Sequence, residues 1–182
     1  MKKILVTGGS GFIGSNLILL LLKKKYAVIN IDKSAYSANP YNVERFKRNK
    51  NYYFFKLDIN ERDKITKIIK KHKPIGIINL AAETHVDRSI DSAEKFIKTN
   101  INGVYNLLEI FRKLKKITKN EMKFLQISTD EVYGDIKEGK LASEKNNYNP
   151  SSPYSASKAS ADQLVQAYGR TYGIKTLIVN PC

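Results

Sequence analysis

Cysteine is nearly absent from this sequence of 182 residues, because the single cysteine, Cys182, is the last residue. No disulfide can form within the chain, and a reducing compartment is the expected setting. Long apolar runs are absent as well: Leu17 to Leu22 falls far short of the roughly 18 residues that suggest a membrane span. The N-terminal run Ile4 to Val6 breaks at Thr7 before the hydrophobic region of a signal peptide develops. These absences predict a cytoplasmic protein without membrane contact.

Acidic residues are few relative to basic ones, with 17 Asp and Glu against 32 Lys and Arg and a formal charge of +15. Such an excess suggests nucleic acid or an anionic surface as a partner. The lysines, however, are spread along expected helices, as in Lys23 to Lys25 and Lys113 to Lys116, and are not interleaved with aromatic residues. We therefore expect solvated helix faces and no nucleic-acid partner. His72 and His85 do not stand at metal-ligand spacing, so no metal is expected, and His72 is predicted at the surface.

Short runs rich in Ile, Val and Leu alternate with longer segments of helical period, which is typical of βαβ units around a parallel sheet. Without an internal repeat or a linker, residues 1–182 are predicted to form one doubly wound α/β domain. The expected strands are Lys3 to Thr7, Ala27 to Asp32, Tyr52 to Leu57, Gly76 to Leu80, Lys123 to Ser128 and Lys175 to Asn180. The expected helices are Gly11 to Lys25, Glu61 to Lys71, Ala93 to Lys116 and Pro153 to Tyr172, with Asn60 and Ser92 as N-caps of the second and third. The stretches 33–42 and 134–152 are expected loops.

Three glycines follow the first expected strand: Gly8, Gly11 and Gly14 stand three residues apart, with Phe12 and Ile13 between the last two. Glycine at a strand-to-helix turn lets main-chain amides and the positive end of the helix dipole reach a pyrophosphate. The third glycine allows the helix to pack closely on the strand. This order of strand, turn and helix predicts a Rossmann dinucleotide site in which these five residues bind the cofactor.

The second expected strand ends at Asp32, near the position where an acidic residue accepts hydrogen bonds from the adenosine ribose. Its negative charge disfavours the 2′-phosphate of NADP, so NAD is the predicted cofactor. Lys33 follows directly and is expected to offset part of that repulsion. Asp58 and Ile59, after the third strand, are placed to contact the adenine edge, although a solvated turn explains Asp58 equally well.

A tyrosine and a lysine four residues apart, Tyr154 and Lys158, lie on one face of an expected helix. Tyr52 with Lys56 and Tyr133 with Lys137 share this spacing, so the spacing alone is weak. Only the first pair opens the long helix after the fifth strand, near the strand ends where open α/β sheets bind ligands. An ordinary tyrosine has a pKa near 10, and its phenolate must be stabilised by about 4 kcal/mol to bring that pKa near neutral, where tyrosine can act as a base. We expect Lys158 and a positive nicotinamide ring to supply it.

The fifth expected strand ends in Thr129-Asp130-Glu131. With this triplet, the chain resembles the extended short-chain dehydrogenase/reductase superfamily, and specifically the dTDP-glucose 4,6-dehydratases, over essentially its whole length. The other segments that carry the resemblance are the glycine turn, Asp32-Lys33, Leu80-Ala81-Ala82-Glu83-Thr84-His85-Val86-Asp87-Arg88-Ser89, and Pro150-Ser151-Ser152-Pro153 running into Tyr154. The Asp-Glu pair is the specific part, since related epimerases usually carry small or hydroxyl residues there. Standing alone, the pair is more readily explained as a solvated acidic turn.

The resemblance implies a hydro-lyase that oxidises, dehydrates and re-reduces one bound dTDP-glucose, with NAD regenerated in each cycle. By position, Tyr154 removes the proton from the hydroxyl on carbon 4, Lys158 tunes Tyr154 and holds the nicotinamide ribose, and Thr129 hydrogen-bonds the same hydroxyl. Glu131 takes the proton from carbon 5, and Asp130 protonates the hydroxyl that leaves carbon 6. Two carboxyl groups in different protonation states can divide acid and base work in this way.

Further residues are assigned by the same resemblance. Leu80, Ala81 and Ala82 are expected at the cofactor, and Thr84, His85 and Asn180 at the substrate. Thr99 is expected under the cofactor together with Asn100, where structural packing explains these two residues as well as a contact with ribose does.

The resemblance also implies a homodimer, formed through the helices expected at 93–116 and 153–172, and a further domain that grips the nucleotide of the substrate. The chain stops at Asn180-Pro181-Cys182, inside a family motif and before that domain. It is expected to be either a fragment of a longer enzyme or a short protein that keeps NAD binding without turnover. Two alternatives stay open: an epimerase or decarboxylase of another nucleotide sugar, and a non-catalytic dinucleotide-binding module.

Overall fold

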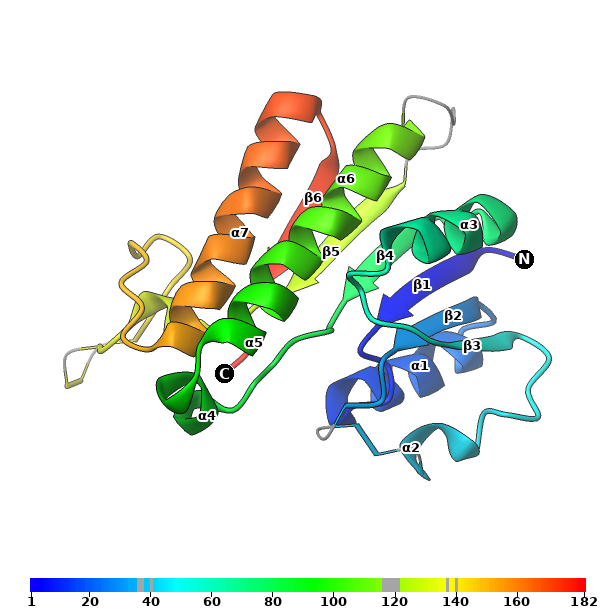
Figure 1. The fold of residues 1–182 in the computed structure, drawn as a ribbon, viewed down its shortest axis with the longest axis horizontal. Coiled ribbons are helices and arrows are strands. Elements are labelled where there is room, and N and C mark those ends of the chain that lie inside the picture. Colours follow the sequence, from blue (N-terminus) through cyan, green and yellow to red (C-terminus); the bar gives the residue numbers. More distant parts are fainter. Residues whose placement is uncertain (36–37, 40, 116–121, 137, 140) are drawn as a thin grey trace.

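The computed structural model describes the chain except residues 36–37, 40, 116–121, 137 and 140. Within this part, a sheet of six parallel strands has the order β3-β2-β1-β4-β5-β6 (Figure 1). The strands are β1 (Lys3–Thr7), β2 (Ala27–Asp32), β3 (Tyr52–Lys56), β4 (Gly76–Asn79), β5 (Lys123–Ile127) and β6 (Lys175–Val179). The order confirms the predicted doubly wound Rossmann fold. Each expected strand is present, although β3, β4, β5 and β6 each end one residue earlier than expected.

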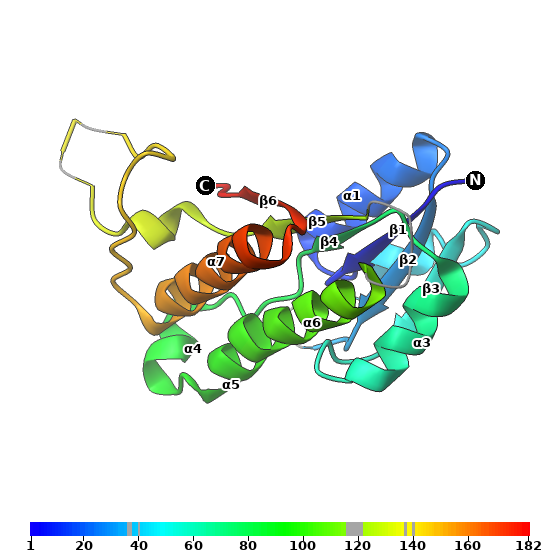
Figure 2. The same ribbon diagram turned by 90° about the horizontal axis from the view of Figure 1, so that it is seen from above.

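The helices cover both faces of this sheet. They are α1 (Phe12–Lys23), α2 (Tyr41–Glu44), α3 (Arg62–His72), α4 (Val86–Asp91), α5 (Glu94–Phe96), α6 (Val104–Lys115) and α7 (Pro153–Tyr172). Buried side chains of α3, α6 and α7 pack on one face, and those of α1 and α2 on the other (Figure 2). Because helices cover its faces, a strand such as β2 is buried at every position and reads as a nearly continuous apolar run. In the described part of the chain, no helix is both long and apolar enough to cross a bilayer.

The direction of the chain changes between two neighbouring strands at the centre of the sheet. The first strand, β1, leads into α1 on one face, whereas β4 leads into α4, α5 and α6, of which α6 packs on the opposite face. Open α/β sheets bind their ligands at the carboxyl ends of strands where the connections diverge in this way. The fold therefore places the candidate site between the loops that follow β1 and β4.

The third expected helix is divided in the structure. Helix α5 is followed by a π-helical segment, Ile97–Gly103, and only then by α6. The expected end at Lys116 lies outside the described residues. Sequence periodicity cannot distinguish these helix types, because their spacings of apolar residues differ by less than a residue per turn. The short helix α4 was missed for a related reason, since its six residues are too few to show a period.

Two predicted N-caps and one predicted surface residue are wrong. Helix α3 begins after Glu61, and Asn60 instead donates to Asp58; Ser92 has an extended backbone and ends α4. His72 is buried against the rings of Tyr53 and Phe55, with centroid distances of 4.9 and 5.7 Å. The lysines around His72 in the sequence suggest an exposed side chain, but its ring packs against the two aromatic rings instead.

Helix α7 has the bounds that the sequence predicts. Ser152 caps it through a reciprocal pair of hydrogen bonds with Ser155, and Pro153 occupies the first turn, where its missing N–H costs nothing. Gly173 ends the helix in the left-handed region, at φ 62°. These signals fix the start of α7, and with it the positions of Tyr154 and Lys158.

Candidate active site

A cavity of about 460 Å³ opens at the carboxyl ends of the strands, a size within the range of ligand sites. It is lined by most residues that the sequence analysis assigned to the cofactor and the reaction: Gly8, Gly11, Phe12, Ile13, Gly14, Asp32, Lys33, Asp58, Ile59, Leu80, Ala81, Ala82, Thr84, Thr99, Thr129, Tyr154 and Lys158. His85, Asp130, Glu131 and Asn180 are not among its lining residues. Sequence reasoning missed Ala35, Ala38, Ile127 and Ser128, which also line it.

The three glycines of the first loop do different things. A Cβ on Gly14 would lie 2.3 Å from the carbonyl oxygen of Gly8, and one on Gly8 would lie 2.7 Å from the backbone of Ala81. Gly8 also has a φ of +68°, which favours glycine. A Cβ on Gly11 would meet only the Gly8 oxygen, at an ordinary 3.5 Å. Packing within the protein thus leaves no room for a side chain at positions 8 and 14, whereas the space beside Gly11 is open to the cavity.

Asp32 is fixed by the loops on either side of it. One carboxylate oxygen accepts from the backbone N–H of Ser10 at 2.9 Å, and the other from that of Ser34 at 2.7 Å. The carboxylate is thereby held at the cavity wall beside the glycine turn, where the sequence analysis placed the adenosine ribose. Each carboxylate oxygen keeps a second lone pair for a ligand.

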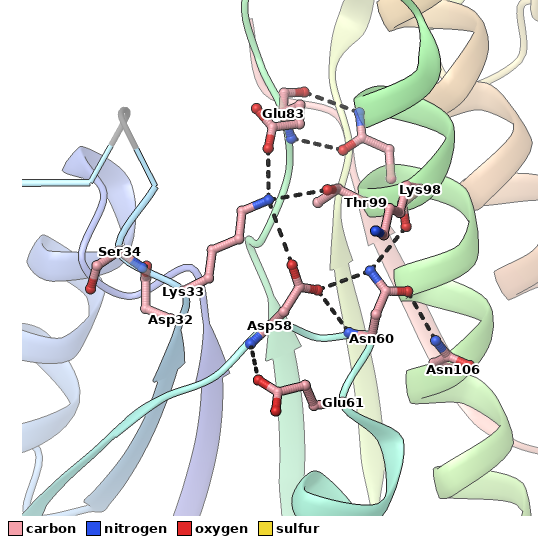
Figure 3. Close-up of polar contacts among 11 residues, drawn as sticks. Asp32, Lys33, Ser34, Asp58, Asn60, Glu61, Glu83, Lys98, Thr99 and Asn106 are labelled. Carbon is pink, nitrogen blue, oxygen red and sulfur yellow. Dashed lines mark hydrogen bonds and ion pairs between the residues drawn. The ribbon is translucent and has the colours of Figure 1, made fainter.

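Lys33 lies away from Asp32, contrary to the expectation that it offsets the charge of that residue. Its ammonium donates to Glu83 at 2.8 Å and to Thr99 at 3.3 Å, and lies 3.8 Å from a carboxylate oxygen of Asp58 (Figure 3). Asp58 is in turn held by the backbone and side-chain N–H groups of Asn60, at 2.8 and 2.9 Å. Asp58 is thus both a turn residue and a cavity residue, so the two explanations left open by the sequence are compatible.

Tyr154 and Lys158 come together in the first turns of α7. The Tyr154 backbone N–H donates to Ser89 Oγ at 3.0 Å, and the Lys158 ammonium donates to the Ile127 carbonyl at 2.7 Å. Of the competing pairs, Tyr52 packs in the core on the α1 face, where it accepts from Asn30, and Lys137 lies outside the described residues. Of the two pairs that the structure describes in full, Tyr154 and Lys158 are the pair that lines the cavity.

On balance, the groups around Tyr154 raise the pKa of its phenol. Burial raises the pKa of Tyr154, a hydrogen bond with Thr129 works in the opposite direction, and the charges of Glu131 and Asp130 raise the pKa further. Burial lowers the pKa of Lys158 to about 8, and the nearby carboxylate of Asp162 opposes that effect.

Asp130 and Glu131 lie on a 3-10 turn, Asp130–Tyr133, directly after β5. Thr129 caps this turn by accepting from the Glu131 backbone N–H at 3.3 Å, and the Asp130 backbone N–H donates to the Pro181 carbonyl at 3.1 Å. Burial and the charge of Asp130 both raise the pKa of Glu131, which makes Glu131 a stronger base than an ordinary glutamate. The pair is therefore anchored next to the Thr129–Tyr154 contact.

The residues expected at the substrate are separated. Thr84 lines the cavity, whereas His85 is exposed at the N-terminus of α4. The Asn180 side chain donates to the Thr129 carbonyl at 3.1 Å and so supports the start of the 3-10 turn. Among the described residues, no group of three His, Cys, Asp or Glu side chains is arranged to hold a metal ion.

Two buried polar residues hold this arrangement together: Asn100, for which the sequence analysis left packing and a ribose contact open, and Asp162, to which it assigned no role. Asn100 accepts from the Glu83 backbone N–H at 2.8 Å, and its amide donates to the Glu83 carbonyl at 3.0 Å and to Ser157 Oγ at 2.9 Å. Asp162, fully buried, accepts from Ser128 Oγ at 2.5 Å and from Tyr148 Oη at 3.1 Å. The available signal for Asp162 was its place four residues after Lys158, on the same face of α7.

Comparison with known proteins now decides the family. The model of the GDP-mannose 4,6 dehydratase family matches residues 5–181. The chain belongs to this family. The dTDP-glucose 4,6-dehydratase of Haemophilus influenzae is 48% identical over 186 residues, which cover 99% of this chain and 55% of that protein. The resemblance to dTDP-glucose 4,6-dehydratases predicted from the motifs is thereby confirmed.

Solved structures agree with the fold. The dTDP-glucose 4,6-dehydratase from Bacillus anthracis in complex with NAD is 39% identical, with a TM-score of 0.87, covering 98% of this chain and 53% of that chain. The UDP-glucose 4-epimerase of Thermus thermophilus in complex with NAD is 31% identical, also with a TM-score of 0.87, covering 98% of this chain and 54% of that chain. The family member described here thus spans about half the length of these relatives.

The buried ammonium of Lys158 makes stability depend on pH. Folded Lys158 releases its proton near pH 8 and an unfolded lysine near 10.5, so burial of the charge destabilises the fold below pH 8, and this penalty disappears as the pH rises to 10.5. Relative to Lys158→Met, the free energy of unfolding of the wild type is expected to rise by about 3 kcal/mol across this window. Urea denaturation at several pH values measures the difference. The exposed Lys50→Met is the control, and a pH-independent difference for Lys158→Met contradicts the prediction.

Proposed function

We propose that this chain is the coenzyme-binding domain of an NAD-dependent nucleotide-sugar 4,6-dehydratase, a hydro-lyase that acts on dTDP-glucose. The observation that carries the proposal is the Asp130-Glu131 turn anchored beside Thr129 and Tyr154. The identity to dTDP-glucose 4,6-dehydratases supports the same substrate. The part of those relatives that lies outside the matched half is proposed to hold the nucleotide of the sugar.

The cavity residues fit NAD. Main-chain amides at the start of α1 face the open space at Gly11, which suits a pyrophosphate, and the carboxylate of Asp32 suits the hydroxyls of the adenosine ribose. The dehydratases from Bacillus anthracis and Streptomyces venezuelae were crystallised with NAD. When bound, NAD supplies the hydride acceptor and a positively charged ring close to the catalytic residues.

Tyr154 is the proposed base for the hydroxyl on carbon 4 of the sugar. Its phenol lies in the cavity wall with the Thr129 side chain, which is placed to hydrogen-bond the same hydroxyl. Because burial and two carboxylates raise its pKa, Tyr154 is held neutral until positive charge is present in the cavity. Lys158, fixed by the Ile127 carbonyl, is proposed to bind the nicotinamide ribose with its remaining N–H donors.

Glu131 and Asp130 are proposed to remove water after the oxidation. Glu131 takes the proton on carbon 5, which is acidic once carbon 4 is a ketone, and Asp130 gives a proton to the hydroxyl that leaves carbon 6. The raised pKa of Glu131 suits the base role. With NAD bound, Glu131 would return its proton to carbon 5 while the hydride held by the coenzyme would go to carbon 6, so that no external oxidant would be consumed.

An epimerase is the neighbouring alternative, and the fold does not exclude it, because UDP-glucose 4-epimerases match with the same TM-score as the dehydratases. An epimerase needs no acid and base to remove water, so the anchored Asp130-Glu131 pair favours dehydration. If the chain were a module that binds NAD without turnover, the Asp130-Glu131 pair would have no role in a reaction.

Alanine substitutions at Gly11 and Gly14 test coenzyme binding and folding separately. Gly11→Ala is expected to leave the melting temperature unchanged but to weaken NAD binding at least about tenfold, because the added methyl group enters space reserved for the pyrophosphate. Gly14→Ala is expected to destabilise the fold by about 1–3 kcal/mol through its contact with Gly8. Calorimetric titration and thermal melts measure the two effects. Normal NAD binding by Gly11→Ala would place the coenzyme elsewhere.

Turnover is tested with the full-length protein that the gene encodes. Wild-type protein with dTDP-glucose should release the 4-keto-6-deoxy sugar, seen by mass spectrometry as the loss of one water. Glu131→Gln should lower this loss at least about 100-fold while the bound coenzyme still becomes reduced. Tyr154→Phe is the control that should block reduction as well. Inversion at carbon 4 without loss of water would identify an epimerase, and NAD binding without any product would identify a non-catalytic module.

We also propose a homodimer formed through α6 and α7. These helices lie side by side (Figure 1), and Tyr105 on α6 and Tyr172 on α7 are each more than two-fifths exposed. Light scattering should give twice the chain mass of 20.7 kDa, and Tyr105→Arg should reduce it towards a single chain. The exposed Tyr41→Arg on α2 serves as the control. A wild-type mass of 20.7 kDa at all concentrations would refute the dimer.

A further inference from the structure

The carboxylate of Glu83 is buried and does not line the cavity, but it accepts a hydrogen bond from Lys33, which does. The side chain of Glu83, on the segment between β4 and α4, is only 6% exposed, and its Oε1 accepts from the Lys33 ammonium at 2.8 Å. The backbone of Glu83 is clamped on both sides by Asn100, which is itself tied to Ser157 of α7. The backbone that carries the carboxylate therefore has a fixed position that does not depend on Lys33.

The other partners of the ammonium also have fixed positions. Thr99 belongs to the π-helical segment, and Asp58 follows β3, where Asn60 holds its carboxylate (Figure 3). Asn60 is anchored in turn to the Lys98 carbonyl at 3.2 Å and to the Asn106 amide at 3.0 Å. Three separate segments thus converge on Lys33, whose ammonium donates to Glu83 and Thr99, forms an ion pair with Asp58 and points away from Asp32 (Figure 3).

This arrangement leaves the adenosine end of the proposed coenzyme site strongly negative. Three carboxylates, those of Asp32, Asp58 and Glu83, lie in this region with one ammonium, and the other basic residue among the described cavity residues, Lys158, is bonded to the Ile127 carbonyl. NADP differs from NAD by a phosphate on the adenosine ribose, next to the position proposed for the Asp32 carboxylate. A lysine directly after Asp32 would stabilise that phosphate if its charge were available.

We propose that Glu83 is a positioning residue that secures the preference for NAD over NADP by holding the Lys33 ammonium away from the 2′-position of the adenosine ribose. This inference rests on the proposed coenzyme site. Asp32 repels a 2′-phosphate directly, and Glu83 removes the cation that would otherwise compensate. Selectivity for the coenzyme is thus set partly by a residue that touches neither coenzyme.

The test is calorimetric titration of the chain with NAD and with NADP. Glu83→Gln keeps the shape of the side chain and removes its charge, so Lys33 becomes available. The dissociation constant for NADP is expected to fall about three- to tenfold, the effect of one partly exposed charge contact, whereas that for NAD changes by less than about twofold. In Glu83→Gln combined with Lys33→Met, the gain for NADP should disappear. A merely structural role for Glu83 would weaken both coenzymes together.

Glu109→Gln is the matched control. Glu109 is also a buried glutamate, 7% exposed, and it pairs with Arg62 and Arg112 away from the cavity, so this variant removes the same charge without releasing Lys33. Its ratio of NADP to NAD affinity should equal that of the wild type. Should Glu83→Gln fail to fold, Glu83→Asp withdraws the carboxylate by one methylene and should shift the ratio in the same direction.

The outcomes are distinct. If the wild type binds neither coenzyme, the proposed function fails. If the wild type prefers NAD but the Glu83 variants leave the ratio unchanged, or if the gain for NADP persists without Lys33, only the inference about Glu83 is overturned.

Discussion

The candidate site depends on one close main-chain contact, between the carbonyl of Gly8 and the Cα of Gly14. This contact seats the first turn of α1 directly on the end of β1, so Phe12, Ile13 and Gly14, whose backbone amides have no partner within the helix, line the cavity. Asp32 is placed relative to the same corner, because its carboxylate accepts from Ser10 within the glycine loop. Any side chain at position 14 would separate helix from strand and so displace both the amides and the acid.

A second set of contacts links the segment after β4, which lies beside the glycine loop, to the start of α7. Asn100 links the segment after β4 to the first turns of α7 through Glu83 and Ser157, and Ser89 accepts from the Tyr154 backbone. These bonds are buried, and a buried amide that lost its partners would be costly. The segment that carries Glu83 and the helix that carries Tyr154 and Lys158 are therefore held as one unit. Pre-organisation of this kind avoids rearrangement at the moment of reaction.

The sequence predicts the parts of this site that have a local signal. Glycine spacing, the acid at the end of β2 and the capped start of α7 each depend on a few neighbouring residues, and the structure brings them together as expected. What the sequence could not predict depends on contacts between distant segments. Lys33 was expected to act on its neighbour Asp32, but Glu83, 50 positions away, holds its ammonium. Likewise, no local pattern indicates that Asn100 spans from Glu83 to α7.

Charge is distributed unevenly along the cavity, and this distribution constrains how a dinucleotide can lie in it. Carboxylates of Asp32 and Asp58 border one end, where a ligand with free hydroxyls can donate to them, whereas Lys158 borders the end beside Tyr154. Burying these groups costs free energy unless each has a partner, and the partners of Lys33 and Lys158 are fixed before any ligand binds. A dinucleotide in the opposite orientation would set its adenosine ribose beside Tyr154 and its reactive ring away from that residue. Hydrogen bonding at the carboxylates and the position of Tyr154 therefore favour the same orientation of the ligand.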